Sequence, residues 1–408
     1  MTVRRVVVTG MGAVSPLGTD IESLAAGIEA GRNATHVMDE WTKCAGLLTH
    51  LAAPAELKNE KLIPRQNRRS MGRMSVFAVQ AAEQALADAG IAVDSIPPER
   101  MGCVIGSTIG SMKSISDMFE KVLPGWDISG LTSMTFFQCI SHTAAMNVAH
   151  HLKITGTVMA PAAACASGLQ AVGTAYDLVR SGRQDMVLCG GAEELHPTVI
   201  ASFDVLYATS AGYNNRPLET PRPFDRDRDG LVCGEGCGIL LVEDYEHAKA
   251  RNAPIYGEIT GYWTCGSGMH VSQSDRQTMV RCMKNAMNEA SVEPKDVDYL
   301  NAHATATRHG DAEEAAAIRE IFGRGVPVSS MKGNLGHTLG AAGAIELILS
   351  LLMMKQGILF PTHNLKNIAP ECEGLDHIME SREKQVDVLL KNSFAFGGIN
   401  AAMVCKRA

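Results

Sequence analysis

Short apolar runs rich in β-branched residues alternate along the chain with alanine-rich segments whose apolar residues recur every three or four positions. The runs predict buried strands, and the periodic segments predict helices with one apolar face. The expected strands are Val6–Thr9, Met101–Ile105, Met186–Cys189, Gly238–Val242, Val297–Leu300 and Ala401–Cys405. The expected helices are Ser75–Ala89, Ser167–Arg180, Gln277–Ala290, Ala312–Phe322 and Gly340–Lys355. This alternation predicts an α/β architecture with mixed or largely parallel sheets covered by helices.

The apolar segments also bear on the cellular compartment. The Arg4–Gly10 segment predicts a buried strand that enters a tight turn at its glycine, and it is too short for a signal peptide. The longest later apolar stretch, Ala344–Met354, is interrupted by Glu346 and is too short to cross a bilayer. We therefore expect a cytoplasmic protein with no membrane span.

Composition and charge narrow the class of protein. A chain of 408 residues with 46% hydrophobic and 20% charged residues is typical of a soluble enzyme with a large core. The net charge of -7 argues against nucleic acid as a partner, although a local basic patch is compatible with it. The 11 cysteines include no CxxC pair, and Cys233 and Cys237 have no second pair at zinc spacing. Neither a disulfide framework nor a structural zinc site is predicted.

Cys165 is the first candidate for chemistry. It stands between a small-residue turn and the helix expected at Ser167–Arg180. A thiol at a helix N-terminus is favoured as the nucleophilic thiolate by free backbone N–H groups and the helix dipole. Small neighbours would let a substrate carbonyl approach closely. Taken alone, a cysteine among alanines is more often a small buried hydrophobe.

Two histidines and a glycine-rich turn downstream change that balance. His303 follows an expected strand, where α/β folds usually place their sites, and His337 precedes an expected helix, five residues after Lys332. Each histidine alone could be structural. Together, two neutral imidazoles could donate hydrogen bonds to a developing oxyanion, and the turn at Phe396 could add a backbone N–H. The set predicts acyl transfer on sulfur, with a cysteine hydrolase as the competing interpretation.

A set of motifs in fixed order resembles the β-ketoacyl-acyl carrier protein synthases, specifically the elongating enzymes of the thiolase-like condensing class. The motifs are Val8–Gly18, Gly190–Glu193, Pro223–Asp225, Arg228–Gly230, Gly234–Gly236, Asn301–His303, Gly336–His337, Gly340–Gly343, Asn392–Phe394 and Phe396–Gly398. The resemblance implies an α/β, thiolase-like five-layered αβαβα fold made of two pseudo-equivalent halves. We assign residues 1–250 to the N-terminal half, which carries the nucleophile, and 251–408 to the C-terminal half, which carries both histidines and the glycine-rich gate loop.

The resemblance also implies roles for residues. The family's Cys-His-His triad falls on Cys165, His303 and His337, and its site lysine falls on Lys332, which would organise the local field. The implied reaction is 3-oxoacyl-[acyl-carrier-protein] synthesis. Cys165 takes an acyl group from a carrier-protein thioester, malonyl carrier protein loses CO₂, and the resulting carbanion attacks the acyl-cysteine. The backbone N–H groups of Cys165 and Phe396 would hold the tetrahedral oxyanion.

Further positions match substrate and partner sites of the family. Thr305 and Thr307 match contacts to the phosphopantetheine arm, or are turn-forming hydroxyls. Phe203 matches the border of the acyl pocket and Phe396 its gate, or both are core packing. A cluster of three arginines matches the family's docking region for acidic carrier proteins, where positive charge would speed the encounter of the two proteins. The alternative is that the cluster is a solvated flank of a helix. The cluster consists of Arg65, Arg68 and Arg69.

Several residues depart from the family pattern. Alanine replaces glycine at Ala304 and Ala395, methionine replaces threonine at Met331, isoleucine replaces threonine at Ile399, and leucine replaces an aromatic at Leu231. None removes a catalytic atom, so activity is expected. Ala395 would stiffen the gate loop if its position required positive φ. The changes put a housekeeping fatty-acid role and the chain-length preference in question, and they favour considering specialised polyene or polyketide elongation.

The resemblance implies acyl carrier protein as the partner, a homodimer or a heterodimer with a related subunit, and no metal or bound redox cofactor. One rival is a coenzyme A thiolase, which characteristically has a second cysteine where this chain has His337. The other is a non-catalytic or partner-dependent chain-length subunit, which typically lacks the cysteine found here at Cys165.

Overall fold

A computed structural model describes residues 3–92, 98–270 and 275–408. The first part of the chain contains β1 (Val6–Val14), α1 (Ile21–Glu29), β2 (His36–Val37), β3 (Leu51–Ala53), α2 (Arg65–Arg68), α3 (Arg73–Asp88), β4 (Met101–Gly106), α4 (Met112–Val122), α5 (Thr135–Cys139), α6 (Thr143–Leu152), β5 (Val158–Met159), α7 (Ser167–Arg180), β6 (Met186–Glu193), α8 (Pro197–Asp204), β7 (Cys233–Gly234), β8 (Gly236–Asp244) and α9 (Tyr245–Ala250). The rest contains β9 (Gly257–Gly266), α10 (Arg276–Glu289), β10 (Tyr299–Asn301), α11 (Arg308–Phe322), β11 (Pro327–Ser329), α12 (Lys332–Leu335), α13 (Ala342–Gln356), β12 (Ile358–Leu359), β13 (Asp376–His377), β14 (Arg382–Glu383), β15 (Val388–Phe394) and β16 (Ile399–Lys406).

Within the described residues, the main sheet has 11 strands in the order β13-β11-β10-β15-β16-β9-β1-β8-β6-β4-β5. Its two parts repeat one pattern of strand order and direction. In the first part, β8 is antiparallel to β1 and β6, and β4 is parallel to β6 and β5. In the second part, β16 is antiparallel to β9 and β15, and β10 is parallel to β15 and β11. The two parts are joined by a short antiparallel pairing of β1 with β9.

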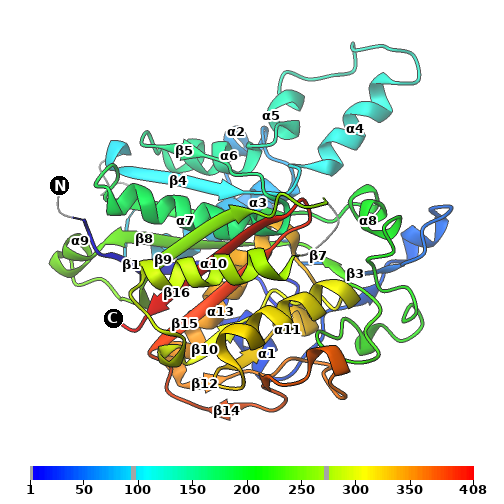
Figure 1. Cartoon of the computed structure of the whole chain (residues 1–408). Coiled ribbons are helices and arrows are strands. Elements are labelled where there is room, and N and C mark those ends of the chain that lie inside the picture. Colours follow the sequence, from blue (N-terminus) through cyan, green and yellow to red (C-terminus); the bar gives the residue numbers. More distant parts are fainter. Residues whose placement is uncertain (1–2, 93–97, 271–274) are drawn as a thin grey trace.

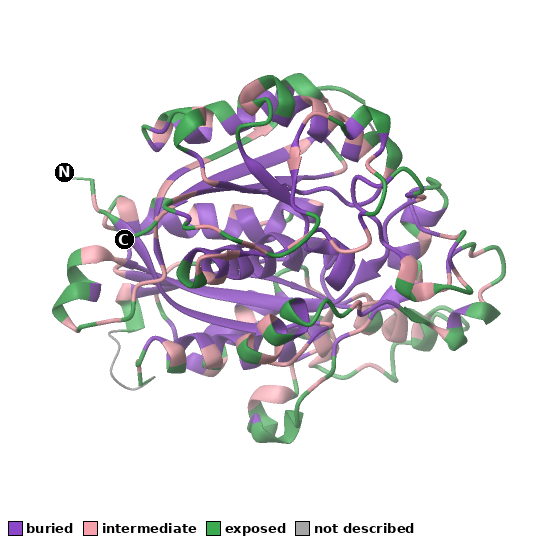
Figure 2. Cartoon of the chain, turned by 90° about the horizontal axis from the view of Figure 1, so that it is seen from below, coloured by how far each residue is buried: buried purple, intermediate pink, exposed green. Residues whose placement is uncertain are grey.

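The helices follow the same repeat and create the layers. Helices α3 and α6 contact the outer face of the first part of the sheet, and α10 and α11 pack together against the second part. Helices α7 and α13 contact each other and strands of both parts, and their inner residues are buried (Figures 1 and 2). The five layers are therefore α3 with α6, the first part of the sheet, α7 with α13, the second part of the sheet, and α10 with α11. This is the thiolase-like five-layered α/β fold of two pseudo-equivalent halves. The proposed division of the chain at residue 250 stays a prediction about domain organisation.

The expected turn at Gly10 is wrong, because β1 runs on to Val14 and bends only at a register shift between Val8 and Gly10. The two glycines of this strand lie under α3. A Cβ on Gly10 would stand 2.1 Å from the carbonyl oxygen of Ala85, and one on Gly12 would stand 2.0 Å from that of Ala81. These glycines permit close packing of a helix on a strand, a use that the sequence pattern alone does not separate from a turn.

Other boundaries differ by a few residues. The expected strand at Val297 begins at Tyr299, and the expected helix at Ala312 begins one turn earlier, at Arg308. The pattern missed β9, whose outward face carries polar and charged side chains, the three-residue strand β11 and the seven-residue strand β15. Helix α7 begins and ends as predicted.

The segment Leu339–Gln356, which includes α13, is long and apolar enough to cross a membrane by composition alone. In this fold, however, 89% of it is buried, and α13 contacts strands of both parts of the sheet. Its apolar character is therefore that of a central core helix.

Candidate active site

The nucleophile candidate and one histidine come from equivalent loops of the two halves. Cys165 lies in a 3₁₀ turn, Ala164–Ala166, directly before α7. His337 lies just before a second 3₁₀ turn, Leu339–Ala341, directly before α13. The first residue of each turn has a left-handed backbone, with φ of 46° at Ala164 and 47° at Leu339. Non-glycine residues rarely adopt this conformation, so both central helices start from the same strained turn at the site.

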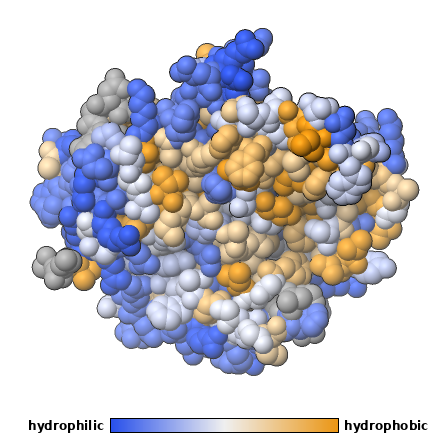
Figure 3. All heavy atoms as spheres, turned by 90° about the horizontal axis from the view of Figure 1, so that it is seen from above, coloured by the Kyte–Doolittle hydropathy of each residue, from blue (hydrophilic) through white to orange (hydrophobic). Residues whose placement is uncertain are grey.

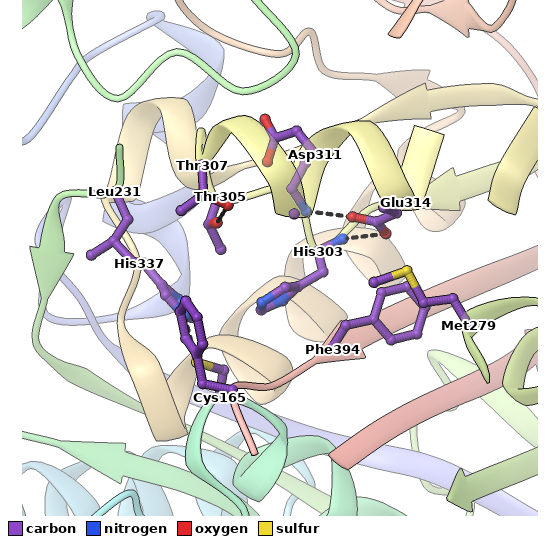
Figure 4. A pocket seen from close by; sticks show the side chains of 13 residues that line it. Cys165, Leu231, Met279, His303, Thr305, Thr307, Asp311, Glu314, His337 and Phe394 are labelled. Carbon is purple, nitrogen blue, oxygen red and sulfur yellow. Dashed lines mark hydrogen bonds between the residues drawn. The ribbon is translucent and has the colours of Figure 1, made fainter. Parts of the chain in front are cut away.

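The structure brings the three predicted catalytic side chains together (Figure 4). Nε2 of His337 lies 2.9 Å from Sγ of Cys165. The rings of His303 and His337 stand edge to face, with centroids 5.2 Å apart and planes at 82°. Phe394 contacts the other side of His303. All three side chains are buried, so any chemistry between them proceeds away from bulk water.

Burial works against the thiolate expected at Cys165 in the resting protein. The pKa of this thiol is raised to about 12, chiefly by burial and in part by the carboxylate of Glu193, whereas the charge of Lys332 opposes the rise. The backbone N–H groups of Cys165 and Phe396 also lower the pKa, because both hydrogen-bond to the sulfur. Removal from water therefore outweighs the helix terminus. Those two N–H groups are the ones predicted to hold the oxyanion.

Both histidines are neutral at physiological pH. Burial and the positive charges of Lys332 and Lys391 hold the pKa of each imidazole well below its usual range. Nδ1 of each ring is buried and has no hydrogen-bond partner among the described residues. No such partner fixes the tautomer, so either ring can carry its proton on Nε2. Neutral N–H donors of this kind suit an oxyanion.

A buried carboxylate holds the His303 loop in place. Glu314, in the first half of α11, accepts hydrogen bonds from the backbone N–H groups of His303 (2.8 Å) and Ala304 (2.7 Å). Asn392 Nδ2 reaches the same carboxylate at 3.2 Å. The carbonyl of Ala304 accepts from the hydroxyl of Ser330 at 2.8 Å. Ala304, which replaces the family's glycine, therefore has both its backbone N–H and its carbonyl hydrogen-bonded, and its methyl group is buried.

Lys332 is part of a buried charge cluster that the sequence did not predict as a unit. Its Nζ lies 2.6 Å from Oε1 of Glu346, and Nζ of Lys391 lies 2.6 Å from Oε2 of the same carboxylate. All three side chains are at most 2% exposed. The Lys332 contact is an ion pair without hydrogen-bond geometry, whereas Lys391 donates a hydrogen bond. Two cations therefore share one anion behind the histidines.

The predicted substrate-contacting residues lie around the same pocket. Thr305 and Thr307 line it, with their hydroxyl oxygens 3.1 Å apart, and Phe396 closes its border. Phe203, on α8, packs against Phe396 with ring centroids 5.9 Å apart. Leu231 also lines the pocket.

Ala395 would stiffen the gate loop only if its position required a positive φ, and it does not. Its backbone has no positive φ, which falls instead on Gly397 (89°) and Gly398 (74°). The alanine therefore imposes no backbone strain on the gate turn, and the two family glycines provide the conformational freedom.

The basic cluster is separate from the pocket. Arg65 and Arg68 form the ends of the short helix α2, and Arg69 follows it. Arg65 and Arg69 are exposed, whereas Arg68 is partly tied to the backbone carbonyl of Glu60 at 2.9 Å. The docking role of this cluster stays a prediction.

One group of donor atoms in the described part of the chain could hold a metal ion. It is the site itself, where the donor atoms of Cys165, His303 and His337 lie within 4.8 Å of one another. Cys233 and Cys237 do not belong to such a group. The absence of a cofactor stays a prediction.

The sequence interpretation missed Glu193, Glu314, Glu346 and Lys391. Two of them carried a readable signal. Glu346 is the lone carboxylate of the largely apolar helix α13, and Lys391 is the lone cation of β15, where it directly follows an apolar run. Charged residues in such places need partners, so each predicts the other type nearby.

Comparison with known proteins agrees with this geometry. Residues 3–248 match the family model described as the beta-ketoacyl synthase N-terminal domain, and 256–366 match the C-terminal domain. The chain belongs to the beta-ketoacyl synthase family, and the predicted resemblance is confirmed.

Two relatives carry the more particular name of 3-oxoacyl-[acyl-carrier-protein] synthase. Synthase 1 of Haemophilus influenzae is 34% identical over 406 residues, covering 99% of each chain. Synthase 2 of Staphylococcus aureus is 37% identical over 419 residues, covering 99% of this chain and 98% of the relative.

Solved structures share the fold closely. A beta-ketoacyl synthase from Burkholderia phymatum is 44% identical with a TM-score of 0.96, covering 99% of this chain and all of that one. A structure of the ishigamide ketosynthase/chain length factor is 31% identical with a TM-score of 0.92, covering both chains fully. A structure of AntDE with AntF, a type II polyketide carrier protein in complex with its ketosynthase bound to the hexaketide, has the same identity, TM-score and coverage.

Proposed function

We propose that the protein is a 3-oxoacyl-[acyl-carrier-protein] synthase, an acyltransferase that elongates fatty-acid or specialised polyene or polyketide chains. The observation that carries the proposal is the buried contact of 2.9 Å between Sγ of Cys165 and Nε2 of His337, with His303 beside it. A coenzyme A thiolase needs a second cysteine at His337, so this observation speaks against it. A chain-length subunit needs no nucleophile, whereas this chain retains one.

Acylation is the first step. Because the Cys165 thiol is neutral at rest, its proton must leave as sulfur attacks the carrier thioester. Nε2 of His337 is the acceptor in contact and can return the proton to the departing pantetheine thiol. The N–H groups of Cys165 and Phe396 stabilise the tetrahedral oxyanion, a kind of contact worth roughly 3 kcal/mol of barrier.

Decarboxylation and condensation follow. With malonyl carrier protein bound, the thioester oxygen faces His303 and His337, and each donates from Nε2. For His337 this requires the neutral ring to move its proton from Nδ1 to Nε2 after acylation, which no hydrogen bond to Nδ1 opposes among the described residues. Loss of CO₂ leaves an enolate, and those donors stabilise its charge because they are already oriented and dry. The carbanion then attacks the Cys165 thioester, and the product is a 3-oxoacyl chain two carbons longer on the carrier.

We further propose acyl carrier protein as the macromolecular partner, docked near Arg65, Arg68 and Arg69. The substrates arrive on its phosphopantetheine arm, past Thr305 and Thr307, and the enzyme uses no metal or redox cofactor. Cytoplasmic location is part of the same proposal, because carrier-protein substrates are made there.

A homodimer is the proposed assembly. Helix α4 has no buried residue and projects with α5 from the body of the protein (Figure 1). The face on that side is broadly hydrophobic (Figure 3). Large apolar side chains exposed on this segment are Phe119, Leu123, Trp126, Ile128, Phe136 and Phe137. The neighbouring strand β5 lies at the edge of the sheet, where a second copy could extend it.

Intact-protein mass spectrometry tests the activity. Wild type and Cys165→Ala are incubated with a panel of acyl carrier proteins of varied chain length, and then with malonyl carrier protein. An acyl mass on wild type alone, followed by a 3-oxo product, is expected. No acyl mass with any primer would contradict the proposal and favour the non-catalytic subunit.

A further inference from the structure

Two thiols outside the active site face each other across two layers of the fold. Cys265 lies near the end of β9 and Cys282 lies in the middle of α10, which packs on that strand. Sγ of Cys265 is 4.0 Å from the carbonyl oxygen of Thr278, one helical turn before Cys282. Sγ of Cys282 is 3.5 Å from the carbonyl oxygen of Trp263, two residues before Cys265 on the same face of β9. The thiol of Cys265 therefore contacts α10 close to Cys282, and the thiol of Cys282 contacts β9 close to Cys265. The two side chains share a hydrogen bond.

The two sulfurs are chemically unequal. Hydrogen bonding from Cys282 and the charge of Arg281 lower the pKa of Cys265 to about 6, although partial burial opposes the shift. Cys265 is partly exposed, whereas Cys282 is buried. A partly exposed thiol of lowered pKa beside a buried second thiol is the arrangement expected of a nucleophilic and a resolving cysteine. Cys165 differs, because burial raises its pKa to about 12.

The dithiol lies next to the gate turn. In the ladder of β9 with β16, Cys265 pairs with Asn400 and Gly266 pairs with Ile399, the first residue after the turn. The backbone N–H of Ser267 donates to the carbonyl of Gly398 at 2.8 Å. A Cβ on Gly398 would stand 2.1 Å from Oγ of Ser267, so the two segments are closely packed. A restraint at Cys265 therefore reaches the turn through two residues of backbone.

We propose that Cys265 and Cys282 are a peroxide-sensitive pair whose disulfide restrains the gate turn at residues 395–398. The thiolate of Cys265 attacks hydrogen peroxide, breaking its O–O bond and giving a sulfenic acid and hydroxide. The Cys282 thiol then attacks the sulfenic sulfur, and water leaves as the S–S bond forms. The two thiols lie beside each other in the structure that buries Cys165, so a disulfide between them would stabilise that arrangement.

The disulfide is tested without any carrier protein, so its outcome does not depend on the proposed synthase activity. The full-length protein is treated with hydrogen peroxide at pH 7, digested without reduction and analysed by mass spectrometry. A cross-linked peptide pair containing Cys265 and Cys282, lighter by about 2 Da than the sum of the reduced peptides, is expected. Cys265→Ser and Cys282→Ser should each abolish it. Cys139→Ser, which removes another partly exposed cysteine, should leave it unchanged. Absence of the pair in wild type would overturn the proposal.

The restraint is tested by the rate at which iodoacetamide alkylates Cys165, read from its own peptide. We expect the oxidised wild type to react more slowly than the reduced protein, by about threefold or more, because the covered state is favoured. Cys265→Ser should show no change after the same treatment. Equal rates in oxidised and reduced wild type, with the disulfide present, would overturn the link to the gate.

Discussion

Replacing Lys391 with methionine should stabilise the protein at neutral pH. Lys391 and Lys332 share the single carboxylate of Glu346, and all three side chains are buried. The pKa of Lys391 is lowered to about 8, chiefly by burial and in part by the charge of Lys332, although Glu346 opposes the shift. Methionine fills a similar volume without charge. Glu346 keeps Lys332 as its partner, so the change leaves no uncompensated buried ion.

The size and sign follow from proton linkage. The folded pKa of about 8 lies below the unfolded value of 10.5, so the unfolded chain binds this proton more strongly. The folded state is therefore penalised by about 3 kcal/mol below pH 8, and the penalty fades as pH rises toward 10.5. Lys391→Met removes it, so the gain in unfolding free energy should be about 2 to 3 kcal/mol at pH 7. That gain should shrink by about 2 kcal/mol between pH 7 and pH 9.5.

Urea unfolding at pH 7, 8 and 9.5 measures the gain, with protein concentration fixed because a second copy would contribute stability. Lys284→Met, on the exposed face of α10, is the matched control and should change stability by less than about 0.5 kcal/mol at every pH. A Lys391→Met protein less stable than wild type at pH 7 would refute the reasoning. So would a gain that is the same at pH 9.5.

Three further changes probe the site. His303→Ala should lower CO₂ release from malonyl carrier protein by about 10²–10³-fold while acyl transfer to Cys165 survives, and equal losses in both assays would contradict separate roles. Glu314→Ala leaves two buried backbone N–H groups without their acceptor, so urea unfolding should report a loss of about 1–3 kcal/mol, and an unchanged midpoint would argue against it. Glu193→Gln removes a carboxylate that raises the pKa of Cys165, so above pH 7 iodoacetamide should alkylate this thiol faster than in wild type. An unaltered alkylation rate would show that this charge does not reach the sulfur.

Much of the site could be predicted from sequence because its residues stand at ends of elements that the hydrophobic pattern locates. Cys165 precedes a helix whose bounds the pattern gave correctly, and His303 follows a strand placed within two residues. The periodicity of apolar residues could not predict that the start of this helix and the end of this strand meet in one site. That prediction came instead from the order of the motifs along the chain, which resembles the family.

The protonation state of Cys165 could not be predicted, because local sequence reports the helix terminus but not the depth of burial. The backbone N–H groups of Cys165 and Phe396 lower the pKa of the thiol, yet removal from water has the larger effect. The same limit applies to Glu314, whose role depends on the backbone direction of a loop eleven residues away. Contacts of this kind are fixed by tertiary packing and not by the pattern of one element.

The two halves of the fold together form the site, and a buried cluster of charges lies behind it. Each half contributes one central helix and one strained turn before it, so the thiol and His337 meet only where both halves are present. Behind them, Lys332 and Lys391 against Glu346 leave surplus positive charge in a dry site. In the proposed reaction the malonyl carboxylate brings a negative charge that passes to the thioester oxygen as CO₂ leaves. Fixed cations and neutral N–H donors stabilise that charge throughout without reorganising, and only a neutral His337 can also accept the proton of Cys165. Holding the pKa of both imidazoles low is therefore a condition of the chemistry, and the second lysine strengthens it.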